Sequence, residues 1–145
     1  MDWSYVAGFF DGEGNFHIVF TKRSIQLVCR MYGDNLETLK KIKQFIGFGN
    51  IYNDKKGIKV SELTITKKDH VKAFIEGILH HLITKRDHAE FILSNYNFGR
   101  NNNLDFDRKA FHSFIKRKGA SKFHSKSRDA EIKERKNYLD GSPNI

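Results

Sequence analysis

The stretch Val6-Ala7-Gly8-Phe9-Phe10-Asp11-Gly12-Glu13-Gly14-Asn15 combines an apolar helical segment with two glycines one turn apart. Gly8 and Gly12 stand at positions i and i+4 on one side of a helix, where a second helix can approach backbone to backbone. Gly12 and Gly14 are poor helix formers, and glycine readily takes the left-handed conformation that ends a helix. The stretch therefore predicts a helix that pairs tightly with another and ends near Glu13.

The length, net charge and cysteine content of the chain limit the kinds of function it can have. A chain of 145 residues has the size of one domain and can bury about 70% of its unfolded surface. The net charge of +9 favours a polyanionic partner, nucleic acid first and an anionic membrane second. The single cysteine, Cys29, excludes an internal disulfide, and no Cys/His spacing suits zinc.

The sequence also bears on the location of the protein. No apolar run approaches the roughly 20 residues that a membrane span needs, and the motif begins too near Met1 for a signal peptide. We therefore expect a soluble, intracellular protein without a membrane partner. The many Asn, Lys and Phe residues are typical of AT-rich genomes, which favours an organelle (chloroplast or mitochondrion) or a prokaryotic cytoplasm.

After the motif, apolar and polar residues alternate, which is typical of strands with one buried face. A turn near Arg23 separates two such runs, so we expect a hairpin. Its inward positions are Phe16, Ile18, Phe20, Ile25, Leu27, Cys29 and Met31. The outward face and its turn carry Asn15, His17, Val19, Thr21, Arg23, Ser24, Gln26, Val28 and Arg30. This polar face suits the reading of base edges, although an ordinary solvent-facing sheet would show the same pattern.

The following segments repeat the arrangement. Residues 36–46 carry apolar positions at helical spacing after a capping Asp34 or Asn35. Two strands should follow, near residues 50–52 and 60–66, and then a helix of roughly ten residues from Lys68 or Asp69. The outward positions of these strands include Tyr52, Glu62, Thr64 and Thr66. The expected order is helix, two strands, helix, two strands, helix.

The opening stretch resembles the LAGLIDADG motif of homing endonucleases. Val6 stands for the first Leu, Phe9-Phe10 for Leu-Ile, Asp11-Gly12 for Asp-Ala, and Glu13-Gly14 for the closing Asp-Gly. The expected order of elements also matches the half-domain of that family. The resemblance implies an α+β fold, αββαββα, in which helices cover one face of a four-stranded antiparallel sheet and the other, saddle-shaped face meets DNA. It covers about residues 3–93 of a single domain spanning residues 1–145.

A second segment is similar to one in the same family. In His81 to Leu93, a lysine precedes a helix that begins with Ala and apolar residues. The family has a lysine beside the scissile phosphate here, and the matching position is Lys85. Read without the family, Lys85 and Arg86 are as readily solvated charges at the start of a helix.

The resemblance implies hydrolysis of a phosphodiester bond by a metal-activated water. Glu13 and Lys85 are the expected catalytic residues, and Glu13 with the carbonyl of Gly12 would bind Mg²⁺ or another divalent cation. Asp11 is expected to have a structural part. The polar residue that often orders the water in this family has no direct counterpart, because the nearest positions are Met31 and Arg30.

The chain contains one copy of the motif, whereas a duplex has two strands to cut. A twofold homodimer would supply two copies of Glu13 near its axis and would recognise a long pseudo-palindromic DNA target. The residues expected at the dimer interface are Ala7, Gly8, Asp11 and Gly12.

The last third of the chain is strongly basic. Residues 116–136 contain nine basic residues against three acidic ones. We expect a helical extension over about residues 105–140 in which Lys116 and Lys118 bind DNA phosphates, with a solvated helix as the equal alternative.

Two other functions remain open at this stage. The chain could act as an intron maturase, because the same fold assists splicing and the charge suits intron RNA equally well. It could also be a non-catalytic DNA-binding regulator on the same scaffold. The presence of both Glu13 and Lys85 favours the endonuclease.

Overall fold

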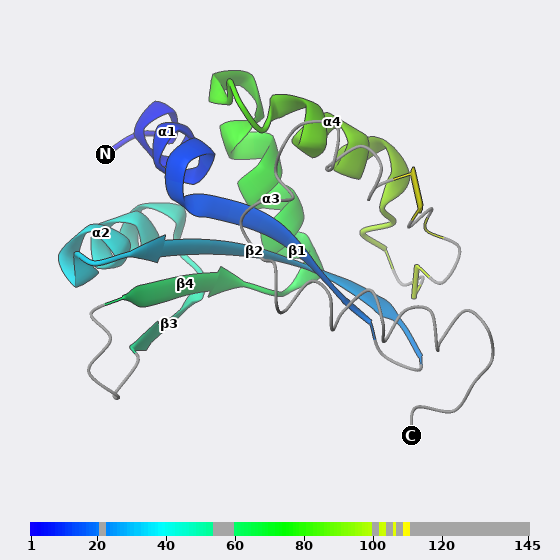
Figure 1. The fold of residues 1–145 in the computed structure, drawn as a ribbon, viewed down its shortest axis with the longest axis horizontal. Coiled ribbons are helices and arrows are strands. Elements are labelled where there is room, and N and C mark those ends of the chain that lie inside the picture. Colours follow the sequence, from blue (N-terminus) through cyan, green and yellow to red (C-terminus); the bar gives the residue numbers. More distant parts are fainter. Residues whose placement is uncertain (21–22, 54–59, 100–101, 104–105, 107–108, 111–145) are drawn as a thin grey trace.

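The computed structural model describes residues 1–20, 23–53, 60–99, 102–103, 106 and 109–110. Their elements follow the order expected from the sequence and confirm an α+β fold (Figure 1). The helices and strands are α1 (Trp3–Glu13), β1 (Gly14–Phe20), β2 (Ile25–Gly33), α2 (Leu36–Ile46), β3 (Asn50–Asn53), β4 (Ser61–Ile65), α3 (Lys68–Ile78), a short 3₁₀ helix η1 (Leu79–His81) and α4 (Arg86–Asn95).

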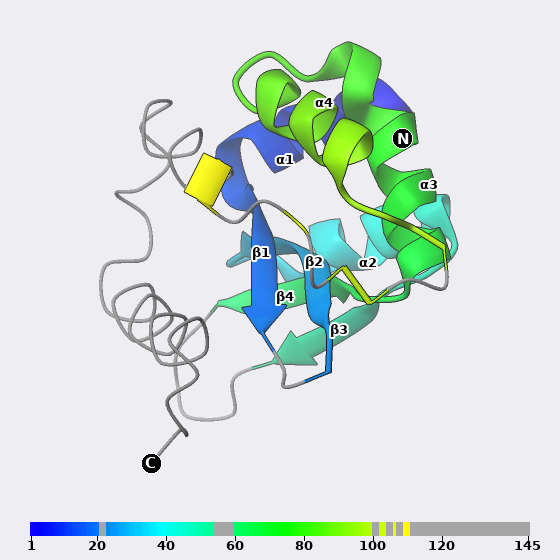
Figure 2. The same ribbon diagram turned by 90° about the vertical axis from the view of Figure 1, so that its right-hand side faces the viewer.

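The four strands form one antiparallel sheet in the order β1-β2-β4-β3. The helices lie on one side of it, and the long strands β1 and β2 bend away from them, so the opposite face is concave (Figures 1 and 2). The register aligns Asn15 with Arg30, Arg30 with Thr64, and Thr64 with Asn50. One row of polar residues therefore crosses all four strands on a single face.

The hydrophobic core fills the space between the sheet and the helices. Alternate residues of the central strands, such as Leu27, Cys29 and Leu63, enter it as the sequence pattern predicts. Phe10 of α1 and Phe74 of α3 meet there with their ring centroids 5.4 Å apart. Burial of these apolar side chains drives the docking of α1 and α3 onto the sheet.

The helix α2 begins and ends where its flanking residues predict. The Asn35 side chain accepts a hydrogen bond from the backbone N–H of Glu37, and Gly47 ends the helix in the left-handed conformation with φ of 89°. Leu39, Ile42 and Ile46 form the buried face of this helix. The helix predicted over residues 36–46 is confirmed.

The segment after α4 ties the chain back to the hairpin. The Tyr96 hydroxyl accepts a hydrogen bond from Leu27 N at 3.2 Å and donates one to Ile25 O at 3.0 Å. Ile25 N donates to Asn102 O at 2.8 Å. These contacts anchor the start of β2 from a segment about 70 residues away in the sequence.

Several sequence-based expectations lie outside the described residues. These are Thr21, Lys116, Lys118 and most of the helical extension expected over residues 105–140. Among the helices that the structure does describe, none is both long and apolar enough to cross a membrane.

Candidate active site and nucleic-acid face

Helix α1 presents two different faces. Asp2 caps its N-terminus by accepting a hydrogen bond from Tyr5 N at 2.8 Å. Val6, Ala7 and Phe10 are completely buried inside the chain. The burial of these three side chains holds the motif helix against the sheet and fixes its end.

The opposite face of α1 is open. Gly8 and Gly12 are exposed, and a Cβ atom added at either would meet no atom within 4 Å. Tyr5 stands on the same face, with 49% of its surface exposed. Of the residues expected at a dimer interface, Gly8 and Gly12 thus lie on an accessible stripe, whereas Ala7 lies in the core.

The end of α1 differs in detail from the sequence-based expectation. Gly14 follows the helix with φ of −105° and ψ of 165°, which is extended rather than left-handed backbone. The reason for glycine is steric, because an added Cβ would lie 2.2 Å from Cδ2 of Phe10. The chain passes directly from the helix into β1, and Glu13 is exposed at this junction.

Asp11 and Lys85 connect the end of α1 to the start of α4. The Asp11 carboxylate accepts hydrogen bonds from Ile83 N at 2.7 Å and from Lys85 N at 2.9 Å. The Lys85 ammonium donates in return to the backbone carbonyl of Asp11 at 2.5 Å. The structural part expected for Asp11 therefore has a definite form, since it binds the loop that carries Lys85.

The surroundings of the Lys85 amine are partly apolar. Burial lowers its pKa, and the nearby carboxylates of Asp11 and Glu13 act in the opposite direction. Lys85 also lies over the Phe10 ring, with Nζ 6.0 Å from the ring centroid. Glu13, Asp11 and Lys85 thus form one electrostatic cluster at the end of the motif helix, although 72 residues separate Glu13 from Lys85 in the sequence.

The donor atoms at this junction suit a hard cation. The last carbonyls of a helix carry partial negative charge, and α1 has no basic residue in its last turn. Glu13 adds a carboxylate there. Mg²⁺ takes such oxygen ligands, few of them from protein. Within the part of the chain that the structure covers, no three His, Cys, Asp or Glu side chains cluster as a complete metal site.

The concave face of the sheet carries the outward residues predicted from alternation. Asn15 and His17 of β1 lie beside Arg30 and Val28 of β2 in the register. Val28 and Thr64 are buried on this face rather than exposed, with 3% and 7% of their surface accessible. Thr64 has larger side chains opposite it on both sides, Arg30 and Asn50, which explains its burial.

One ion pair lies on this face. Arg30 Nε lies 3.3 Å from Glu62 Oε1, and both side chains are about 28% exposed. The same Glu62 oxygen accepts a hydrogen bond from the Thr64 hydroxyl at 2.9 Å. Among the residues that the structure describes, no acceptor forms an aligned hydrogen bond with Arg30 Nε, so its contact with Glu62 is an ion pair that a stronger acceptor can displace.

The register adds residues that the sequence analysis missed. Tyr32 stands opposite Glu62 on β2, and Asn50 stands opposite Thr64 on β3, so both share the outward face with Tyr52. The alternation that selected Arg30 and Tyr52 extends to Tyr32 and Asn50 and could have found them. The remaining predicted positions in the described chain are Val19, Arg23, Ser24, Gln26 and Thr66, along or beside the same strands.

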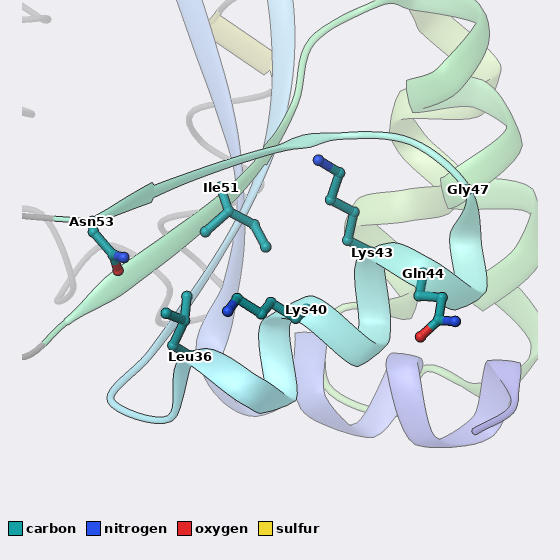
Figure 3. Close-up of a pocket in the computed structure, with 7 residues that line it drawn as sticks. All are labelled: Leu36, Lys40, Lys43, Gln44, Gly47, Ile51 and Asn53. Atoms are coloured by element: carbon teal, nitrogen blue, oxygen red, sulfur yellow. The ribbon is translucent and has the colours of Figure 1, made fainter.

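A pocket of about 620 Å³ lies elsewhere, between α2 and β3 (Figure 3). Its lining includes Lys40, Lys43 and Ile51, and the two lysine side chains extend from α2 toward the strand. Ile51 alternates with the outward Tyr52, so the pocket opens on the helix side of the sheet. It belongs neither to the end of α1 nor to the concave face.

Solved structures with a similar fold include homing endonucleases and a LAGLIDADG meganuclease. The homing endonuclease I-CvuI, in complex with DNA, matches with a TM-score of 0.58 at 20% identity, over 63% of each chain. I-AabMI bound to uncleaved DNA matches with a TM-score of 0.57 at 26% identity, over 65% of this chain and 35% of that one. The archaeal intron-encoded I-Vdi141I, complexed with DNA, matches at 18% identity and a TM-score of 0.57, over 63% of this chain and 64% of that one.

These matches span less than two thirds of each relative's own length. No curated protein matches the sequence. The sequence does match the family model described as LAGLIDADG endonuclease over residues 6–106, which is more than half of the chain. The match begins at Val6, the first motif residue, and includes Lys85 and the whole sheet. The chain is therefore a member of the LAGLIDADG endonuclease family.

Proposed function

We propose that this protein is a site-specific homing endonuclease that cuts both strands of a long DNA target as a homodimer, using a divalent metal ion. The observation that carries the proposal is the cluster at the end of the motif helix, where the half-buried Lys85 amine bonds to Asp11 and lies within the electrostatic range of the exposed Glu13. A solvent-accessible carboxylate can hold a metal ion, and a partly buried amine can stabilise charge on a phosphate, so the two groups suit phosphodiester hydrolysis.

Glu13 and the carbonyl of Gly12 would hold the metal ion. When bound, Mg²⁺ lowers the pKa of a water and stabilises charge on the attacking and leaving oxygens. Lys85 would donate hydrogen bonds to the phosphate oxygens or to the water beside them, and its low exposure strengthens these interactions. Structures of I-CvuI with target DNA in the presence of 2 mM Mg or 2 mM Ca support the use of a divalent cation.

The open stripe of α1 supports the homodimer. Tyr5, Gly8 and Gly12 follow one another at spacings of three and four residues, which is the spacing of a helix–helix seam. The two glycines allow two copies of α1 to approach closely about a twofold axis. This packing would place two Glu13 residues near the axis, one for each strand of the duplex.

The concave face would read the DNA. A row of polar residues crosses this face from β1 to β3, and the face is polar rather than densely charged. Surfaces that read base edges directly have this character. Arg30, Asn15 and Gln26 can donate to base edges in the major groove, whereas Glu62 can accept from amino groups of cytosine or adenine. Two copies of the sheet would recognise two half-sites, so the target should be pseudo-palindromic. The excess of basic residues adds affinity for phosphates.

The test is cleavage, in magnesium, of a plasmid that carries candidate target DNA. The natural candidate is the uninterrupted allele of the gene whose intervening sequence encodes this protein. We expect one double-strand cut by the wild-type chain and none by the Glu13→Gln variant, with DNA binding retained. Glu76→Gln is the matched control, because Glu76 is an exposed carboxylate on α3, away from the motif helix end, and its ion pair is with Lys72 of the same helix at 3.9 Å.

Two results would contradict the proposal. Cleavage by Glu13→Gln at the wild-type rate would exclude Glu13 as the metal-binding acid. Absence of cleavage by the wild type, together with tighter binding to structured intron RNA than to duplex DNA, would favour a maturase.

A further inference from the structure

The end of α1 and the start of α4 carry partial charges of opposite sign, and each is compensated by a charged side chain from the other helix end. The carbonyl of Asp11 lies in the last turn of α1 and has no partner in its own helix, because α1 ends at Glu13. The Lys85 ammonium supplies that partner. At the same time the Asp11 carboxylate lies before the N-terminus of α4, whose N-cap residue is Lys85. Each charge thus stands at the helix end of opposite polarity.

We infer that Asp11 is a positioning residue for the active site: it holds the loop before α4 so that the Lys85 ammonium stays at the end of the motif helix, where Glu13 lies. The inference rests on the proposed function for its catalytic consequence. Its structural content, the attachment of the loop to the motif helix through a single carboxylate, stands on the hydrogen bonds alone.

Binding the two loop amides requires both oxygens of the Asp11 carboxylate. Oδ2 accepts from Ile83 N and Oδ1 accepts from Lys85 N, so two amides on alternate residues bind one side chain. An asparagine keeps one acceptor but turns an NH₂ group toward the other amide, and two donors then face each other. Leu82, one residue earlier, is buried in the core, whereas the side chain of Ile83 is 88% exposed. The carboxylate therefore attaches residues 83–85 to α1 beyond the point where the core holds the loop.

Holding the loop also holds the amine. Lysine has a long, flexible side chain, and an unrestrained amine would sample many positions. Here the backbone of Lys85 is fixed by the carboxylate of Asp11 and its Nζ atom by the carbonyl of the same residue. Both ends of the side chain are thus restrained, and the amine is kept in a half-buried place near Glu13.

The two carboxylates of the motif therefore have separate tasks. Asp11 uses its oxygens on amides of the protein, whereas Glu13, two residues later, lies exposed at the helix end. This division explains why a motif with two acids supplies one metal-binding acid for each subunit.

A double-mutant cycle tests the inference. The variants are Asp11→Asn, Lys85→Met and the two combined, with Glu76→Gln as a control for loss of a surface carboxylate. If Asp11 acts through Lys85, Asp11→Asn lowers the single-turnover cleavage rate about 100-fold while DNA affinity stays close to wild type. The double variant should then cut no more slowly than Lys85→Met alone. Losses that multiply in the double variant, or a loss confined to DNA binding, would overturn the inference.

Amide hydrogen exchange of the free protein supplies a readout that needs no cleavage. We expect the amides of Ile83 and Lys85 to exchange faster in Asp11→Asn than in wild type, while the amides of β2 stay protected. Unchanged exchange at both amides would contradict the inference even in an active enzyme. If the wild type cuts no DNA, the proposed function fails, and the exchange result still decides whether Asp11 holds the loop. Should Asp11→Asn fold poorly, Asp11→Glu replaces it, because the longer side chain keeps the charge but displaces the two oxygens.

Discussion

The ring of Phe10 occupies the space in which a side chain at Gly14 would begin. Phe10 cannot turn away, because its ring centroid lies 4.9 Å from that of Phe16 and 5.4 Å from that of Phe74 in the core. The glycine that directly follows the motif helix is thus required by packing.

The first prediction follows from this contact. Gly14→Ala would place Cβ 2.2 Å from Phe10 Cδ2, and overpacking of this kind destabilises a protein by about 1–3 kcal/mol. Denaturant unfolding measures the loss. Gly33→Ala on β2 is the matched control, because its Cβ would lie 3.4 Å from the nearest atom, Phe9 Cζ, and we expect little change. Equal stability of Gly14→Ala and wild type would show that the ring moves aside.

The second prediction concerns the open face of α1. Gly8→Leu adds a side chain where the chain itself leaves room, so the fold should persist by circular dichroism while the proposed dimer dissociates. Sedimentation velocity measures the oligomeric state. Ala73→Leu, which enlarges an exposed residue of α3, should leave the dimer intact. A dimeric Gly8→Leu variant would place the subunit contact on another surface.

The third prediction concerns Tyr96. Tyr96→Phe removes the hydroxyl that bonds Ile25 O and Leu27 N, and buried polar groups left unpaired cost about 1–3 kcal/mol. The Leu27 amide should also exchange faster. Tyr52→Phe is the control, because Tyr52 is 57% exposed. A stability loss no larger than that of Tyr52→Phe would mean that water replaces the missing hydroxyl.

Tyr96 should also make the stability of the folded chain depend on pH in the alkaline range. Burial raises the pKa of its phenol, so the folded chain keeps the proton at a pH where the unfolded chain releases it. The stabilisation that comes from this difference in pKa is complete below the unfolded pKa of about 10. It declines as the pH rises from there toward the higher pKa of the folded chain. We expect Tyr96→Phe to lose less stability than wild type between about pH 10 and 11. Parallel stability curves for the two proteins would contradict this.

The fourth prediction concerns Cys29. This thiol is completely buried in the core, and burial raises its pKa far above the ordinary value, so it should not react with thiol reagents in the folded chain. Labelling followed by mass spectrometry should find modification only at the rate of global unfolding, and denaturant should accelerate it. Rapid labelling without denaturant would show local opening of the sheet at β2.

Much of this protein follows from the sequence by itself. Alternation from Phe16 to Met31 determined the first hairpin and its two faces, because strand side chains point in turn to opposite sides. The apolar spacing of Leu39, Ile42 and Ile46, with Asn35 before them and Gly47 after, determined α2. The whole stretch from Val6 to Asn15 indicated the family through its resemblance to the LAGLIDADG motif. These signals are local, so no knowledge of distant neighbours was needed.

Other features were decided only by the tertiary structure. The sequence could not show that Asp11 binds Ile83 and Lys85, because no local pattern joins residues more than 70 positions apart. The burial of Ala7 and Thr64 depends likewise on which strands and helices cover them. Gly14 appeared to be a conformational requirement, whereas the ring of Phe10 makes it a steric one. Packing brings these groups together only after the helices dock on the sheet, and the site exists as a cluster only in the folded chain.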